Sequence, residues 1–208
     1  NFGDITGGDT TGRQSPSGYS EFDYDFKAKA GLSDNTSLTL ALQNVHQTDV
    51  DVYHKIALEN YAVNRMHPQN RQLGYFRLNS RIDKGILKSL QTTVSLHNTK
   101  EGRDLQKNGS SVMRHEEDKV RSFGFSAEGV TEKGSVWEAA SGIEVYYDLV
   151  DSSRTDTDLS TGTVTSKRGL YPDGSSMASI AAFSLHSFDL GNWIVAAGSG
   201  CSGRRENA

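Results

Sequence analysis

Apolar and polar residues alternate with a period of two over long stretches of this chain. From Phe22 to Leu32 every even-numbered residue is aromatic or aliphatic, while four of the intervening positions carry charge. A period of two places successive side chains on opposite faces of a β-strand. The charged set predicts a face turned to water, and the apolar set predicts a face turned to lipid or to a core.

The same alternation recurs and predicts about eight antiparallel strands, with turn residues that tolerate left-handed backbone closing each hairpin. The predicted strand regions are 21–32, 38–45, 74–83, 90–96, 123–127, 137–149, 178–188 and 193–197. The predicted tight turns are 33–35, 83–85, 132–134 and 189–192.

Three long polar segments, 47–71, 98–119 and 151–176, separate these hairpins, so the predicted connections alternate between short and long. Transmembrane barrels combine short periplasmic turns with long extracellular loops, whereas soluble sandwiches mix loop lengths. The longer predicted strands, at about 10 to 14 residues, also exceed the five or six typical of globular sheets. The pattern therefore predicts an all-β fold, an antiparallel up-and-down transmembrane β-barrel section. Aromatic residues near strand ends predict interfacial girdles, and these are Trp137, Tyr147, Phe188 and Trp193.

Composition and motifs argue against several other classes. The net charge is -4 and the cations are scattered, so no nucleic-acid partner is expected. One cysteine, Cys201, cannot form a disulfide framework or a cysteine zinc site. His115 and Glu116 lack the second histidine of a zinc-protease motif, and no nucleophile elbow or phosphate loop is found. The chain is therefore predicted not to be an enzyme.

The chain is expected to be one section, 1–208, of a larger barrel domain. It begins with Asn rather than Met, without a charged region followed by an apolar one, so its start is expected to be internal to a longer chain; the Gly/Thr-rich segment 7–12 resembles an outer loop whose preceding strand is missing. The last predicted strand stops at Gly198, and 199–208 are predicted to be a truncated or aberrant tail without a terminal aromatic residue.

Segments 48–55, 59–61, 142–148 and 168–174 resemble the barrel of TonB-dependent outer-membrane receptors, especially the haem, haemoglobin and transferrin-receptor-like branch. The resemblance extends over roughly 18–198. It implies a barrel of about 22 strands in the bacterial outer membrane, filled by a plug that contacts the energy-coupling protein TonB and is not seen in this chain. The implied function is uptake of an iron-bearing ligand such as haem, a haem protein or a siderophore. No resident cofactor is implied, since haem or the iron complex is the transported ligand.

The resemblance implies ligand contacts in the long polar segments. Five of the six histidines, His46, His54, His67, His97 and His115, lie in them or at their ends. Neutral imidazole binds haem iron, and tyrosine stacks on flat rings or contacts a protein partner. The alternative for each is an ordinary solvated histidine or a tyrosine that packs a loop. The candidates are His54, His67, His115, Tyr53, Tyr61 and Tyr171.

Two other function classes stay open at this point: a passive outer-membrane channel or adhesin, and a soluble β-sandwich binding domain. The direction of the apolar strand face distinguishes them. In a membrane barrel, Phe22, Phe26 and Val145 face lipid while Asp25 and Glu144 face a watery lumen. In a sandwich, the apolar set faces a second sheet about 10 Å away.

Overall fold

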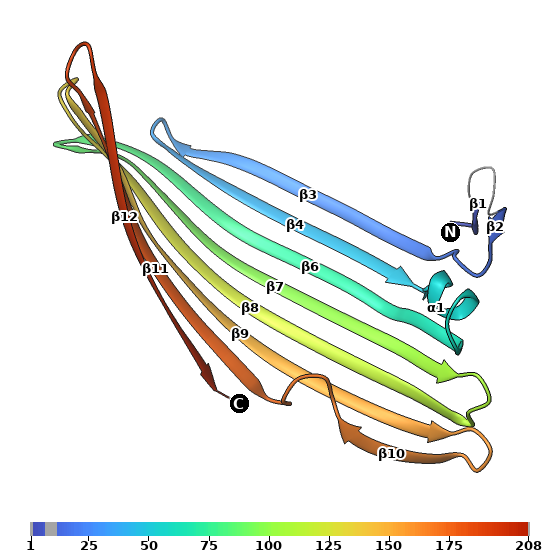
Figure 1. Ribbon diagram of the computed structural model, residues 1–208. Coiled ribbons are helices and arrows are strands. Elements are labelled where there is room, and N and C mark those ends of the chain that lie inside the picture. The colour runs from blue at the N-terminus through green and yellow to red at the C-terminus, as the bar shows by residue number, and fades with distance from the viewer. Residues whose placement is uncertain (1, 7–11, 208) are drawn as a thin grey trace.

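The computed structural model describes residues 2–6 and 12–207, and a ten-stranded antiparallel sheet dominates it (Figure 1). The predicted loop at 7–12 lies outside the described residues except for Gly12. Eight main strands follow one another across the sheet in chain order, which confirms the predicted up-and-down topology. They are β3 (Ser20–Ser33), β4 (Thr36–Thr48), β6 (Tyr61–Lys84), β7 (Leu87–Lys107), β8 (Val112–Lys133), β9 (Trp137–Asp158), β11 (Ser175–Asp189) and β12 (Ile194–Asn207).

Several short elements lie at one end of this sheet. They are the hairpin of β1 (Ile5–Thr6) and β2 (Arg13–Gln14), the strand β5 (Val50–Asp51) beside β6, the helix α1 (Tyr53–Ala57), and β10 (Thr163–Arg168), which pairs with β9. In the described part of the chain, no helix has the length and apolar character needed to cross a membrane.

The four predicted tight turns all join neighbouring strands at the other end of the sheet, which we call the tight-turn end. Gly85, Gly134 and Gly191 have φ of 62°, 65° and 85°, a backbone conformation that side chains with a Cβ rarely adopt. Glycine at these three positions therefore allows each hairpin to close in a few residues.

The strand register separates apolar from polar side chains in the part of the sheet nearer the tight-turn end, because directly paired residues of antiparallel strands point to the same face. Three successive rows on one face are almost entirely apolar, and we call them the apolar band. The rows are Phe26, Leu42, Gly74, Leu96, Phe123, Tyr147 and Ala178; Ala28, Leu40, Phe76, Val94, Phe125, Val145 and Ile180; and Ala30, Leu38, Leu78, Thr92, Ala127, Ile143 and Ala182.

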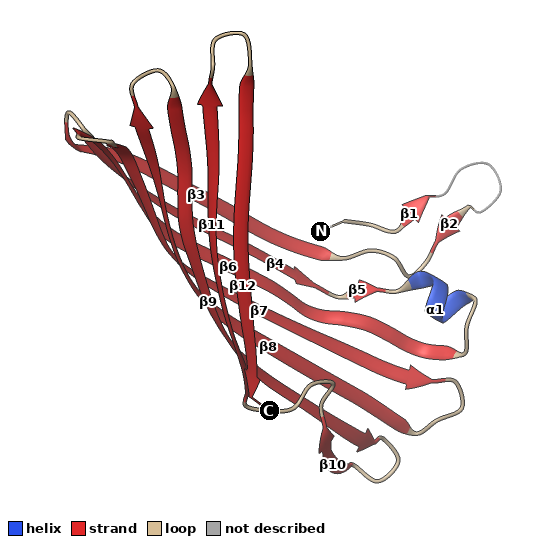
Figure 2. Ribbon diagram, turned by 60° about the vertical axis from the view of Figure 1, so that its left-hand side comes forward, coloured by secondary structure: helices blue, strands red, loops and turns tan. Residues whose placement is uncertain are grey.

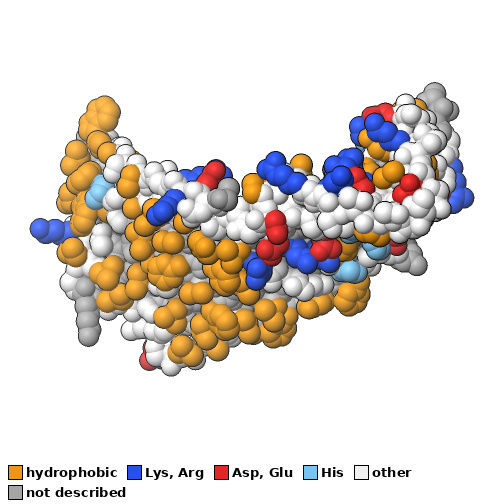
Figure 3. Space-filling model, turned by 90° about the horizontal axis from the view of Figure 1, so that it is seen from below, with side chains coloured by type: hydrophobic (Ala, Val, Ile, Leu, Met, Phe, Trp, Pro, Cys, Tyr) orange, Lys and Arg blue, Asp and Glu red, His pale blue; other side chains and the backbone are white. Residues whose placement is uncertain are grey.

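The apolar band is not covered by another layer of the chain. Phe26, Phe76 and Val94 are 53%, 55% and 53% exposed, and Ala139 is the one buried hydrophobic residue among those the structure describes. A soluble sandwich would bury these side chains under a second sheet. Seen from below, hydrophobic side chains form a continuous field toward the tight-turn end, and charged ones gather toward the other end (Figure 3).

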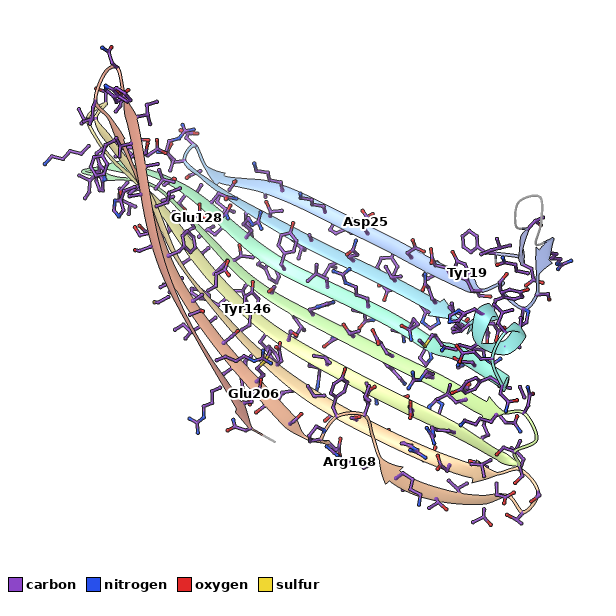
Figure 4. The ribbon with its side chains drawn as sticks, viewed as in Figure 1. Tyr19, Asp25, Glu128, Tyr146, Arg168 and Glu206 are labelled. Carbon is purple, nitrogen blue, oxygen red and sulfur yellow. The ribbon has the colours of Figure 1, made fainter. Side chains whose placement is uncertain are left out.

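The sheet curls into a trough with β12 and β3 on opposite sides (Figure 2). The polar face is the concave one, because the hollows of the trough are lined mainly by residues of this face. The residues predicted to face a lumen lie here. Figure 4 labels three of these concave-face residues, Asp25 on β3, Glu128 on β8 and Tyr146 on β9.

The apolar band lies within an uncharged stretch of the convex face that has the height of a bilayer core. On β9 this stretch begins at Trp137, which pairs with Phe188, and ends at Tyr147, which pairs with Phe123. Ten residues of strand rise about 33 Å, and a tilt of about 40° reduces this to about 25 Å, the height of the apolar band of outer-membrane barrels. Predicted girdle residues thus occupy both edges of this stretch.

The prediction of long loops was wrong, because most of the polar segments are strand. Beyond the row of Asn44, Gln72, Asn98, Arg121 and Leu149, the strands β6 to β9 continue for about ten residues. We call this part the overhang; it comprises 61–72, 98–107, 112–121 and 149–158. The connection from β7 to β8 is only 108–111. The two ends of the sheet therefore differ mainly in how far the strands extend beyond the apolar band, and less in the length of the loops.

The end of the chain also differs from its prediction. β12 does not stop at Gly198 but continues to Asn207, in unbroken register with β11 from Ile194 opposite Asp189 to Asn207 opposite Ser176. This strand could not be recognised from the sequence, because small residues such as Gly198, Gly200 and Gly203 leave no alternation of apolar and polar side chains.

Candidate functional site

Ion pairs hold the concave face of the overhang together across β7, β8 and β9. Arg103 binds Glu116, Arg114 Nε lies 3.5 Å from Asp156, and Arg154 binds the same Asp156 at 2.6 Å. The hydrogen bond from Arg154 outweighs desolvation and lowers the pKa of Asp156. These pairs replace the side-chain packing that an apolar face would supply.

Two of the predicted ligand histidines lie at the two ends of a chain of close contacts with charged side chains on the opposite, convex face of the overhang. His115 Nδ1 lies 2.7 Å from Asp104, which lies 3.4 Å from Arg65. Arg65 lies 3.3 Å from Asp49, and His67 Nδ1 lies 3.2 Å from the same carboxylate. In the described residues, no three His, Cys, Asp or Glu side chains converge on a point that could hold a metal.

The other predicted residues on this side lie around α1. Tyr53 begins the helix, and His54 in its first turn is exposed. Tyr61 begins β6 and borders a small hollow of about 130 Å³ with Leu105 and Arg114. His54 is therefore open to solvent at the rim of the trough, while Tyr53 and Tyr61 are half-buried.

Tyr171 lies apart from them, on a loop that folds back onto the concave wall. Its backbone N–H donates to Ser152 Oγ at 3.1 Å, and Ser152 N–H donates to Asp173 Oδ1 at 3.0 Å. Ser152 is 4% exposed, and its hydroxyl donates in turn to Asp118 on β8. We call this set, Asp118, Ser152, Tyr171 and Asp173, the loop latch.

A groove of about 430 Å³ opens beside the loop latch and forms the candidate site. It is bordered by Leu170 and Tyr171 from the loop and by His97, Glu101 and Asp118 from the wall. Leu170 and Tyr171 are 60% and 49% exposed, so an apolar side chain and an aromatic ring are presented to solvent above carboxylates. Such a surface can stack on a flat ligand and hydrogen-bond its polar edge.

His97 is held in a defined state within this groove. Arg71 Nε donates to His97 Nε2 at 3.1 Å, so Nε2 accepts and the ring is neutral with its proton on Nδ1. His97 therefore offers the groove an N–H donor. His97 was not among the six predicted contacts, and neither were Asp118 and Ser152, because only the cross-strand register brings them to Tyr171.

Toward the tight-turn end, the concave wall continues into a second hollow of about 410 Å³ lined by Tyr75, Arg77, Glu144 and Tyr146. The Arg77 guanidinium lies 5.3 Å from the centre of the Tyr75 ring. A Cβ at Gly124 would lie 2.4 Å from Ser95 Oγ and 2.8 Å from the Tyr146 ring, so glycine leaves room for both side chains here. The wall thus provides a polar, aromatic path across the height of the apolar band.

A serine–histidine pair on the convex face does not have the geometry of a nucleophile. Trp137 Nε1 donates to His186 Nδ1 at 3.2 Å, so the proton of the neutral ring is on Nε2. Nε2 lies 2.9 Å from Ser184 Oγ and donates to it. In this tautomer His186 cannot accept the serine proton, as a general base must.

Comparison with solved structures shows which fold this trough belongs to. The copper transporter OprC matches 96% of this chain with a TM-score of 0.75 at 11% identity, and the match covers 30% of OprC. The ferric citrate transporter FecA in its unliganded form matches 93% with a TM-score of 0.66 at 14% identity, again over 30% of its length. No family model matches the sequence, and no curated protein does. The chain, which spans about 30% of each transporter, has the fold of a section of a transporter β-barrel.

Proposed function

We propose that this chain is a wall section of an outer-membrane receptor that takes up an iron- or metal-bearing complex, with haem or a siderophore as the expected ligand. The tight-turn end is the periplasmic side and the overhang is the extracellular side. The observation that carries the proposal is the exposed apolar band, which lies within an uncharged stretch about 25 Å high and is backed by a polar concave wall. The two solved neighbours, a copper transporter and a ferric citrate transporter, support a metal-bearing ligand.

The ligand first meets the rim and then the groove. His54 and Tyr53 on α1, Tyr61 at the start of β6, and His67 and His115 in the overhang are proposed as capture residues. Tyr171 is proposed as the residue that holds the ligand against the wall, because its loop is latched there and its ring is exposed. Movement through the barrel then requires a plug and TonB, which the TonB-dependent resemblance places elsewhere in the receptor.

Ligand titration of the full chain in detergent tests this function. Haemin is followed by its Soret band, and ferric citrate is followed by quenching of tryptophan fluorescence. We expect saturable binding of one probe that Tyr171→Ala weakens about tenfold, the loss typical of removing a stacked aromatic contact. Tyr19→Ala, remote from the groove, serves as the control.

Uptake by cells distinguishes an energy-coupled receptor from a passive channel built on the same wall. Accumulation of the bound probe should stop when the inner-membrane proton gradient is collapsed. Accumulation that continues unchanged, without saturation, would support the passive channel and contradict the receptor.

A further inference from the structure

We propose that Lys100, Lys119 and Arg121 form a binding site for the phosphate groups of a membrane lipid, on the convex face directly above the apolar band. The inference rests on the proposed membrane orientation and adds to it a specific lipid partner. The same chemistry would bind free phosphate, but the position of the site beside the band points to a phosphorylated lipid headgroup.

Strand register places these cations on the lipid side of the sheet. Lys100 lies four residues beyond Leu96 on β7, and Lys119 lies four residues before Phe123 on β8, with no bulge between. Even spacing keeps them on the face of the apolar band. Arg121 is two residues from Phe123, on the same face.

Arg121 lies at the height of a headgroup layer, and the backbones of the two lysines lie a few ångströms above it. Two residues of strand rise about 7 Å and four about 13 Å, and a tilt of about 40° reduces these to about 5 and 10 Å above the band. The headgroup region extends roughly 5–8 Å beyond the hydrocarbon core on each side. Lysine and arginine stems can reach back toward the core while their charge stays among the phosphates.

The charges of the cluster are not balanced within the protein. Lys100 and Lys119 are direct cross-strand partners, an arrangement of like charges that is unfavourable without an anion. Both bind Glu117, at 2.8 and 2.9 Å, and Arg121 lies 3.1 Å from Asp151. Three cations and two carboxylates leave one positive charge in a partly exposed cluster.

The positive excess is specific to the convex face. On the concave face of the same strands, the corresponding rows carry Glu101, Asp118 and Asp148 beside the single cation Arg71. A general need for solubility would not sort the charges by face. Attraction to an anionic surface that meets only the convex face accounts for the difference.

Lipid titration of the full chain in neutral detergent tests the site, with lipid A bearing two phosphates as the probe and dephosphorylated lipid A as the comparison. We expect Lys100→Gln/Lys119→Gln to weaken binding of the phosphorylated probe about tenfold. The matched control is Lys27→Gln/Lys29→Gln, which removes the same charges from the concave face of β3 and should leave binding unchanged.

A second variant distinguishes lipid binding by this cluster from a purely structural role of its ion pairs. Glu117→Gln removes the carboxylate that competes with phosphate for both lysines, so it should tighten lipid A binding, whereas a purely structural role for the cluster predicts no gain. The site is overturned if the two double variants bind lipid A equally. It is also overturned if dephosphorylated lipid A binds as tightly as the phosphorylated form, or if inorganic phosphate competes at lipid concentrations.

Insertion into vesicles distinguishes failure of this inference from failure of the proposed function. A full chain that inserts, yet binds lipid A without regard to Lys100 and Lys119, overturns the lipid site alone. A full chain that does not insert overturns the membrane receptor and the lipid site together.

Discussion

Gly102 on β7 lies where the backbone of β6 approaches most closely. The register of β6 shifts between Met66 and Gln69, and a Cβ at Gly102 would lie 2.1 Å from the His67 carbonyl oxygen. Because the obstacle is backbone, Gly102→Ala should destabilise the overhang by about 1–3 kcal/mol. Hydrogen exchange of the β6 and β7 amides should report the loss. Gly31→Ala, which meets nothing within 4 Å, is the control and should exchange like the unmodified chain.

Ser152 is the buried centre of the loop latch, and its hydroxyl serves two partners. Ser152→Ala leaves the Tyr171 N–H and the Asp118 carboxylate without that hydrogen bond, a cost of about 1–3 kcal/mol. We expect the loop at 169–174 to detach more often and become a protease target, while the strands stay intact. Ser153→Ala changes the exposed neighbour on the convex face and should leave cleavage at its original rate.

The residues of the groove could be predicted from the sequence only in part. Tyr171 was predicted because it lies in a long polar segment and has an aromatic ring suited to ligands. His97 was noted at the end of such a segment but not chosen as a contact, and Ser152 was not considered, since the two belong to different strands and meet only through a register set by hairpins at the far end of the sheet. A single sequence contains no direct signal for such a register.

At the scale of elements, the tight turns and the strands inside the apolar band were predicted correctly, because one wet face and one apolar face impose a period of two. The overhang was predicted as loop for the same reason. Both of its faces are wet, so 98–107 and 112–121 show no alternation although they are paired throughout. Ion pairs such as Lys100 with Glu117 and Arg103 with Glu116 stabilise these strands instead.

Acid should loosen the overhang before the rest of the sheet. The hydrogen bond from Arg154 lowers the pKa of Asp156, so ionised Asp156 contributes stability that is fully present above its ordinary pKa of 3.8. That contribution is lost as pH falls through the lowered pKa. Hydrogen exchange at 151–158, corrected for intrinsic rates, should therefore rise below about pH 4.

Asp156→Asn provides the matching variant for this pH dependence. It should exchange faster than the unmodified chain at neutral pH and equally at low pH, where both side chains are uncharged. Asp34→Asn, in a turn at the opposite end, should show no difference at 151–158. A constant gap between Asp156→Asn and the unmodified chain at all pH values would contradict the electrostatic origin.

At the scale of the whole molecule, the sheet is open. In the described residues, β3 pairs only with β4 and β12 only with β11, so each edge strand presents a row of backbone N–H and C=O groups without a ladder partner. Lipid cannot satisfy such groups, and spanning sheets in membranes are closed for this reason. The apolar band and the open edges together require further strands on both sides when the wall stands in a bilayer.

The apolar band makes a prediction that depends on face and not on position along the chain. Leu78 lies in the apolar band, in the row between Leu38 and Thr92, and its neighbour Asn79 faces the concave wall near Glu128. Arginine at the lipid midplane costs about 2–4 kcal/mol, while a lumen position tolerates it. Leu78→Arg should therefore lower the urea midpoint of the full chain folded in lipid vesicles, and Asn79→Arg should leave it nearly unchanged. Equal loss in both variants would mean that Leu78 packs against protein, and the apolar band would then be an interface with another chain.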